Sequence, residues 1–220
     1  MEVGFFGGAT VSEAKPYRFA IPEYSVDGMT ILDVGCQTGR DFTNSHYTHA
    51  RALYGVDVDR EAIHEGQRQY PHIHLSVDPA EKLPFGDAFF DLVISRVALP
   101  YTNIPVAIKE IYRVLKPGGY LYLSMHDVHM QLLWLKEAIR KRSINRIVDH
   151  AYIFPASILF NLTGVCVARP WVNQRETFQT VKGMRKSLLA VGFTRITTER
   201  TDRHRIFQAR RSELTDTPDL

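Results

Sequence analysis

The chain has 220 residues, of which 45% are hydrophobic and 23% are charged, and it carries a formal net charge of +3 with a pI near 8.8. These values are typical of a globular protein of one domain, and the positive charge is too weak to indicate nucleic-acid binding by itself. Neither Cys36 nor Cys166 lies in a CxxC or metal-ligand spacing. We therefore expect free thiols in a reducing compartment and, without a signal-peptide pattern at the N-terminus, a cytoplasmic protein.

Apolar segments of strand length alternate with segments of helical periodicity along most of the chain. In chain order we expect a strand at 30–35, a helix at 40–49, a strand at 52–57, a helix at 59–69, a strand at 72–77, a strand at 91–95, a helix at 106–115, a strand at 120–125, a helix at 178–191, and closing strands at 193–199 and 204–210. This order predicts an α/β fold with a doubly wound, mostly parallel sheet and an antiparallel strand near the C-terminus. Ligands bind such sheets at the carboxyl ends of the strands.

Residues 127–178 interrupt this alternation with a basic amphipathic stretch, followed by the uncharged run AYIFPASILFNLTGVCVA. We expect these residues to form a lid inserted into a single domain that comprises residues 1–220. A transmembrane helix is disfavoured because Pro155, Asn161 and Gly164 interrupt the run. Basic residues next to an uncharged run also allow a peripheral membrane contact through 136–168.

The stretch ILDVGCQTGR predicts a buried strand that runs into a tight glycine loop. Gly35 and Gly39 have the spacing G-x-x-x-G, which differs from the G-x-G-x-x-G of dinucleotide-binding proteins. A glycine pair of this kind could be purely structural. Asp57, however, ends the second predicted strand about twenty residues later, where a carboxylate can accept both hydroxyls of a ribose. Together the two features favour a nucleoside-containing cofactor.

Four segments resemble the signature motifs of the class I S-adenosylmethionine-dependent methyltransferases, in the same order and with similar spacing. They are ILDVGCQTGR, GVDVDREAI, AEKLPFGDAFFDLVIS and EIYRVLKPGGYLYLS. Together they span roughly residues 30–125. The resemblance implies a Rossmann-like fold with S-adenosyl-L-methionine as the cofactor.

The resemblance also implies roles for residues of this chain. Asp33 would order the glycine loop, and Asp57 would hold the ribose, with Val58 against the adenine. The other cofactor-binding residues that it implies are Gly35, Cys36, Gln37, Thr38, Gly39 and Arg40 in the loop, Ala80 and Glu81 at the adenine edge, and Arg96 and Val97 at the methionyl end. The chain departs from the family where Gln37 replaces a usual glycine and where Pro79 replaces a usual acid.

The loop after the fifth predicted strand offers a candidate base. Methyl transfer is an in-line displacement, so a base is needed only when the acceptor must lose a proton. His126 is the candidate, since imidazole titrates near neutral pH, although a loop without a chemical role is an alternative. Tyr101, His129 and Trp134 are candidate substrate contacts. No metal site is expected, because the spacing of His126, Asp127 and His129 is too tight.

These features predict methyl transfer to a small-molecule acceptor, at a hydroxyl oxygen. Two alternatives stay open: a lipid or membrane-linked acceptor, and a non-catalytic subunit that binds the cofactor, for which Gln37 is the only support. A nucleic-acid acceptor is disfavoured, since no Asn-Pro-Pro-Tyr type tetrapeptide follows the fourth predicted strand. The oligomeric state stays open.

Overall fold

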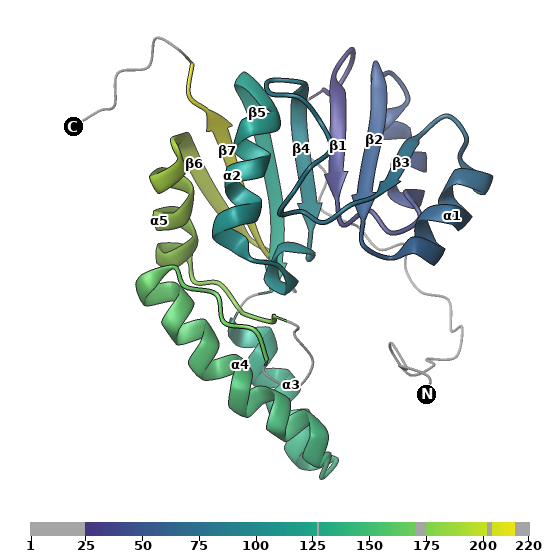
Figure 1. Cartoon of the computed structure of the whole chain (residues 1–220). Coiled ribbons are helices and arrows are strands. Elements are labelled where there is room, and N and C mark those ends of the chain that lie inside the picture. Colours follow the sequence, from purple (N-terminus) through teal and green to yellow (C-terminus); the bar gives the residue numbers. More distant parts are fainter. Residues whose placement is uncertain (1–24, 127, 170–174, 202–203, 214–220) are drawn as a thin grey trace.

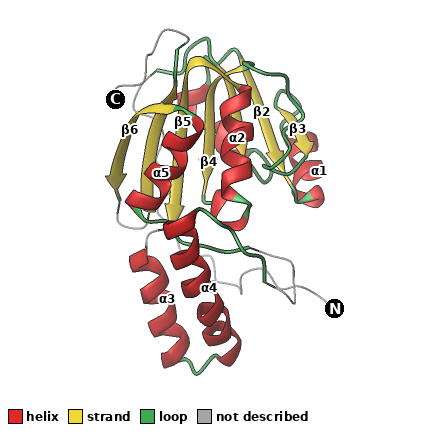
Figure 2. Cartoon of the chain, turned by 60° about the vertical axis from the view of Figure 1, so that its left-hand side comes forward, coloured by secondary structure: helices red, strands yellow, loops and turns green. Residues whose placement is uncertain are grey.

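The computed structural model describes residues 25–126, 128–169, 175–201 and 204–213. A sheet lies between helices on its two faces, and a helical hairpin extends beyond the carboxyl ends of the parallel strands (Figures 1 and 2). The strands are β1 (Thr30–Val34), β2 (Ala52–Asp57), β3 (His74–Val77), β4 (Phe90–Arg96), β5 (Leu115–His126), β6 (Phe193–Arg200) and β7 (His204–Arg211). The α-helices are α1 (Arg60–Gln69), α2 (Ile104–Val114), α3 (Val128–Arg140), α4 (Ile144–Thr163) and α5 (Val181–Val191), and three short 3-10 helices are η1 (Arg40–Thr43), η2 (Ser45–Tyr47) and η3 (Leu99–Tyr101).

The strand order is β3-β2-β1-β4-β5-β7-β6, and β7 runs antiparallel to both of its neighbours. The remaining pairings are parallel, from β3 through β5. This confirms the predicted doubly wound sheet with an antiparallel strand near the C-terminus. The chain leaves β1 toward β2 on one side and returns to β4 on the other, so a ligand site is expected at the carboxyl ends of β1 and β4.

Side-chain alternation along the strands divides the core into two layers. Leu32 and Val34 of β1 belong to the layer that contains Ile108 of α2 and Leu188 of α5. Ile31 belongs to the opposite layer, which contains residues of α1 and of the 3-10 helices. Figure 1 shows α2 and α5 in front of the sheet, with α1 on the other side. Asp33 therefore lies on the face of η1, η2 and α1.

The structure corrects one predicted element and shifts several predicted boundaries. The expected helix at 40–49 is wrong, because these residues form η1 and η2 with extended backbone at Asn44 between them. The Asn44 side chain accepts a hydrogen bond from His46 N and thus starts a new turn instead of continuing the helix. Strand β5 begins at Leu115 rather than at residue 120, since Leu115 pairs with Phe90 before an irregular register.

Helices α3 and α4 form the hairpin that Figure 2 shows beyond the sheet. The carboxyl ends of the parallel strands point toward this hairpin in Figure 1. Phe160 of α4 is buried in the layer of α2 and α5, and the Asn161 amide accepts from Thr180 N just before α5. Helix α5 starts later than predicted, at Val181, because Thr180 caps it through Gly183 N. Among the described helices, none is sufficiently long and apolar to cross a bilayer.

Candidate functional site

The glycine loop turns tightly between β1 and η1, with left-handed backbone at Gly35 (φ +83°), Gln37 (φ +50°) and Gly39 (φ +74°). Gly35 N and Cys36 N both donate to Val56 O, at 2.8 and 3.1 Å, which holds the loop against the end of β2. A Cβ atom on Gly35 would lie 2.1 Å from the Cβ of Ala98, which follows β4. Glycine is therefore required at position 35 both by conformation and by space.

Asp57 is tied to this loop by its carboxylate. Its Oδ2 accepts from Gln37 N at 2.8 Å, and its Oδ1 accepts from Asp59 N at 2.9 Å. A carboxylate has about four lone-pair sites, so each oxygen keeps capacity for another donor. The sequence did not predict the contact with Gln37 N, because only the folded loop brings that amide to the end of β2. Next to Asp57, the side chain of Val58 is 71% exposed.

Gln37 occupies the position that glycine usually fills in the class I methyltransferases that the sequence resembles. Its left-handed backbone explains the usual glycine, and its side chain is exposed rather than packed into the loop. Of the neighbouring loop residues, Thr38 is half-buried and Arg40 is exposed. Cys36 is buried, and burial raises the pKa of its thiol, which leaves it protonated and unsuited to act as a nucleophile.

An ion-pair triad lies at the ends of β1 and β4, with Arg96 and Asp33 buried and Asp41 partly exposed. The Arg96 guanidinium contacts Asp33 at 2.5 Å and Asp41 at 3.1 Å, and the side chains of Arg96 and Asp33 are 6% and 2% exposed. Burial raises the pKa of Asp33, and the charge of Arg96 opposes this shift. Burial alone would lower the pKa of Arg96, but Asp33 and Asp41 outweigh it and raise that pKa. The triad joins η1, β1 and β4.

Two residues expected at the cofactor have structural partners at this edge. Arg96 was expected at the methionyl end of the cofactor, and the structure directs it to Asp33 and Asp41. Glu81 was expected at the adenine edge, and its Oε1 accepts from Asn103 N at 2.7 Å, at the start of α2. Ala80 beside it is buried.

Val97 has left-handed backbone (φ +58°), which is rare for a β-branched residue. Its N–H donates to Ser124 O on β5 at 2.7 Å. This bond directs the chain after β4 so that Ala98 meets Gly35. Strained backbone of this kind is common at functional sites, and here it accompanies the close approach of Ala98 to Gly35.

His126 ends β5 and lies in an aromatic cluster. Its ring is edge-on to Trp134 of α3 with centroids 4.7 Å apart, and it stacks with His204 of β7 at 5.6 Å. Burial, together with the neighbouring His204, lowers the pKa of His126 to about 4, so its imidazole is neutral at pH 7. Its Nδ1 is buried without a hydrogen-bond partner in the described part of the chain.

The other two candidate substrate residues are more exposed. Tyr101 lies in η3 after β4 and is 46% exposed, and His129 is exposed on α3. The structure thus brings Trp134 to His126. Within the described residues, no group of three or more His, Cys, Asp or Glu side chains could hold a metal ion. Asp127 lies outside the described residues.

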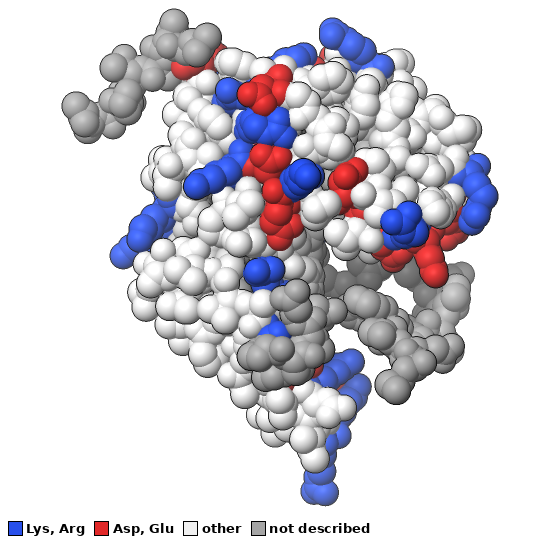
Figure 3. All heavy atoms as spheres, in the orientation of Figure 1, with Lys and Arg blue, Asp and Glu red and all other residues white. Residues whose placement is uncertain are grey.

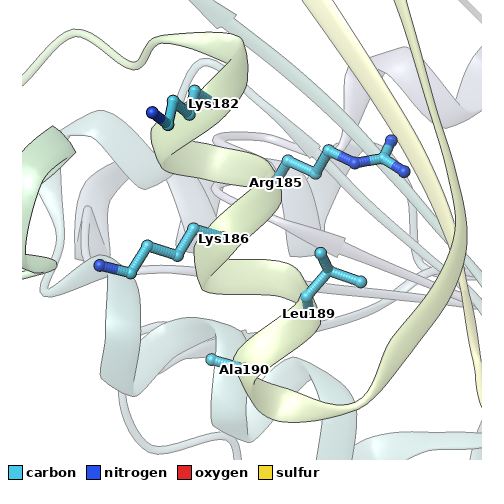
Figure 4. Close-up of a pocket in the computed structure, with 5 residues that line it drawn as sticks. All are labelled: Lys182, Arg185, Lys186, Leu189 and Ala190. Carbon is cyan, nitrogen blue, oxygen red and sulfur yellow. The ribbon is translucent and has the colours of Figure 1, made fainter. Parts of the chain in front are cut away.

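An open hollow of about 510 Å³ lies on α5, away from the glycine loop. It is lined by Lys182, Arg185, Lys186, Leu189 and Ala190. Figure 4 shows the side chains of Lys182 and Lys186 directed to one side of α5 and that of Arg185 to the other. This surface is basic, and it is separate from the residues at the carboxyl ends of β1 and β4.

Residues 32–123 match the protein family described as methyltransferase domain, and they contain the glycine loop, Asp57 and the exit of β4. Over these residues the chain is similar to a methyltransferase domain, in agreement with the resemblance of its four sequence segments. S-adenosylmethionine is the cofactor indicated for a domain of this type. Aspartate at the end of β2 and a glycine loop after β1 suit a nucleoside-containing ligand of this kind.

Curated proteins with methyltransferase names match parts of the chain. A malonyl-[acyl-carrier protein] O-methyltransferase from Pectobacterium atrosepticum is 26% identical, with 76% of this chain and 65% of the relative covered. A ubiquinone/menaquinone biosynthesis C-methyltransferase from Rubrivivax gelatinosus is 39% identical, with 52% of this chain and 45% of the relative covered. The chain thus spans about half the length of the curated relatives that it matches.

Solved structures of methyltransferases share the fold. An S-adenosylmethionine-dependent methyltransferase from Mesorhizobium loti superposes with a TM-score of 0.60 at 20% identity, covering 86% of this chain and 93% of the other. A SAM-dependent methyltransferase from Methanosarcina mazei gives a TM-score of 0.58 at 23% identity, covering 86% of this chain and 95% of the other. At these identities, the likeness concerns the fold.

Proposed function

We propose that this protein transfers a methyl group from S-adenosylmethionine to a small-molecule acceptor, at a hydroxyl oxygen. The observation that carries the proposal is the arrangement of Asp57, whose carboxylate is held by Gln37 N and Asp59 N beside the exposed Val58. Its remaining lone pairs can accept the two ribose hydroxyls, and Val58 offers an apolar surface to the adenine. The loop from Gly35 to Gly39 passes the amino-acid part of the cofactor.

The cofactor supplies an activated methyl group whose carbon–sulfur bond breaks as the bond to the acceptor forms. The protein then has to hold the acceptor oxygen in line with the methyl group, and to remove the hydroxyl proton. His126 is the proposed base because it ends β5 at the carboxyl ends of the strands and its imidazole is neutral at pH 7, but the burial that lowers its pKa to about 4 also makes it a weak proton acceptor. Trp134, in contact with His126, and Tyr101 after β4 are the proposed acceptor contacts.

The names of the relatives include both O- and C-methyltransferases, so the acceptor atom rests on the proposed role of His126. Gln37 offers little support for a non-catalytic cofactor-binding subunit, since its side chain is exposed and its N–H supports Asp57. A lipid-linked acceptor is the second candidate, and the exposed face of α4 described below favours it.

Calorimetric titration with S-adenosylmethionine and S-adenosylhomocysteine tests the cofactor site. Asp57→Ala removes the ribose acceptor and the partner of Gln37 N, and charge-assisted hydrogen bonds contribute roughly 1.5–3 kcal/mol each. We therefore expect its cofactor affinity to fall by about 10- to 150-fold or more. The matched control is Asp59→Ala, which removes the N-cap of α1 two residues away and should leave the affinity nearly unchanged.

Two results would count against the proposal. If the folded wild-type protein binds neither ligand, the site is not an S-adenosylmethionine site and the proposal is wrong. Equal affinity of Asp57→Ala and wild type would mean that the ribose lies elsewhere. Once binding is established, hydroxylated metabolites can be screened by mass spectrometry for products that gain one methyl group. A His126→Gln variant should then lower kcat while the affinity for S-adenosylmethionine stays unchanged.

A further inference from the structure

Helix α4 has two apolar faces, and only one of them is packed. Ile153, Ala156 and Phe160 are buried toward the domain. The opposite face is exposed and uncharged along the whole helix. Its members follow helical spacing and are Ile144, Val148, Ala151, Pro155, Ile158 and Leu162, which we name the outer stripe of α4. These residues lie on one side of the helix because each is separated from the next by three or four positions.

The outer stripe is long and strongly exposed. Ile144, Ile158 and Leu162 are 74%, 55% and 69% exposed. From Ile144 to Leu162 the stripe runs about 27 Å along the helix axis. The α4 flank facing left in Figure 3 shows no charged side chains over most of its length. Single exposed apolar residues are ordinary, but a continuous exposed stripe marks an interaction surface.

Positive charge lies at both ends of the outer stripe. The hairpin end carries Lys136, Arg140, Lys141, Arg142 and Arg146. Glu137 pairs with Arg140 and Lys141, and the other three cations make no ion pair within the described residues. Figure 3 shows blue side chains at the lower end of the hairpin. At the other end, Lys186 Nζ of α5 donates to Leu162 O at 3.3 Å, and Lys182 precedes it by one helical turn (Figure 4).

The same region has few acidic residues, and those it has are paired with cations. Residues 128–168 hold five lysine and arginine residues against two acids, Glu137 and Asp149. Asp149 pairs with Arg169 at 2.7 Å. The stripe therefore offers apolar side chains between two groups of cations, without a carboxylate of its own.

We propose that the outer stripe of α4 and its basic ends dock on the surface of an anionic lipid bilayer. The aliphatic side chains would enter the boundary between headgroups and acyl chains, and the flanking lysine and arginine side chains would pair with anionic headgroups. A second copy of the chain fits less well, because two such faces would bring together cations with no acidic partners. The inference does not depend on the proposed function, since it rests on the surface of α4 and on the cations of α3, α5 and the hairpin turn beside it.

Vesicle co-sedimentation tests the proposal with the full chain. Vesicles of equal parts phosphatidylglycerol and phosphatidylcholine are compared with pure phosphatidylcholine, at about 50 and about 500 mM salt. The stripe variant is Ile158→Gln with Leu162→Gln, and the charge variant is Lys136→Gln with Arg146→Gln. The matched control is Val106→Gln, an apolar residue of α2 that is 40% exposed and lies outside the hairpin. Circular dichroism establishes that each variant is folded.

We expect the wild type to bind the anionic vesicles at low salt, and to bind at least about tenfold more weakly to neutral vesicles or at high salt. Both hairpin variants should lose about tenfold or more, and Val106→Gln should bind like the wild type. If the stripe variant unfolds, Ile144→Gln at the most exposed position replaces it.

No sedimentation of the wild type with anionic vesicles at low salt would overturn the proposal. So would a folded stripe variant that binds as tightly as the wild type. Light scattering on the same samples measures the oligomeric state. If the protein does not bind vesicles but forms a dimer that the stripe substitutions dissociate, this face is an interface with a second copy of the chain.

Discussion

Replacing Arg96 by methionine would leave Asp33 as a carboxylate with no cation beside it. In the wild type the two side chains are 6% and 2% exposed and lie 2.5 Å apart, with Asp41 at 3.1 Å on the other side of the guanidinium. Removing one partner of a buried ion pair costs about 3–5 kcal/mol, because the remaining charge stays desolvated. We expect Arg96→Met to lower the free energy of unfolding by this amount at pH 7.

Urea denaturation followed by far-UV circular dichroism measures this loss. The matched control is Arg140→Met, whose arginine also contacts a carboxylate, Glu137 at 2.6 Å, but with a side chain that is 70% exposed. Exposed pairs of this kind contribute little to stability because water screens them, so the control should denature close to the wild type. The contrast isolates burial, because the two pairs have nearly the same distance.

The effect of Arg96→Met should also depend on pH. Burial already raises the pKa of Asp33 in the wild type, and loss of the cation would raise it further. A carboxyl whose pKa is raised on folding destabilises the folded state at pH values above its unfolded pKa, and this penalty disappears where it is protonated in both states. The loss should therefore be smallest in acid and grow as the pH rises. A loss at pH 7 that is no larger than that of the control would refute the assignment of a buried ion pair between Asp33 and Arg96.

Two further predictions concern the loop and the histidine at the end of β5. Gln37→Gly should keep the affinity for S-adenosylmethionine, and a collapse of binding in the titration would show that the Gln37 side chain is part of the site. The same substitution should change the free energy of unfolding by no more than about 1 kcal/mol, because the relief of left-handed strain opposes the greater entropy of glycine in the unfolded chain. Burial lowers the pKa of His126 from 6.5 to about 4. The free energy of unfolding should therefore fall as the pH falls from 6.5 toward 4, because in this range only the unfolded state binds a proton at this residue. The reduction should reach at most about 3 kcal/mol and be shallower in His126→Gln; denaturation curves with the same pH dependence in both proteins would contradict it.

Much of the architecture could be predicted from local sequence. The apolar runs that became β1, β2 and β4 are bounded by polar or turn residues, and Asp59 was recognisable as the N-cap of α1 because its side chain can reach the amides of the first turn. The prediction failed at 40–49, where short polar side chains such as Asn44 compete for backbone amides and no apolar periodicity indicates which turn will form.

Some features of the site could also be predicted from the sequence, and others could not. Gly35, Gly39 and Asp57 were identifiable because their types and spacing are dictated by a tight turn and by the end of a strand. The bond from Gln37 N to Asp57 was not, since it depends on the left-handed backbone of one loop residue and on the register of β1 against β2. Arg96 finds Asp33 across 63 positions of sequence, and only the parallel pairing of β1 with β4 brings them together.

Helix α4 shows most clearly what the sequence by itself determined and what it left open. Its composition was sufficient to predict an uncharged run interrupted by Pro155, Asn161 and Gly164, and the structure ends the helix at Gly164. Apolar residues surround the helix, so periodicity could not indicate which face would be buried. Only the tertiary structure, which anchors Phe160 in the core and Asn161 beside α5, decided that the opposite stripe faces outward. Burial depends on which surfaces the rest of the chain brings to the helix, and that information is not local.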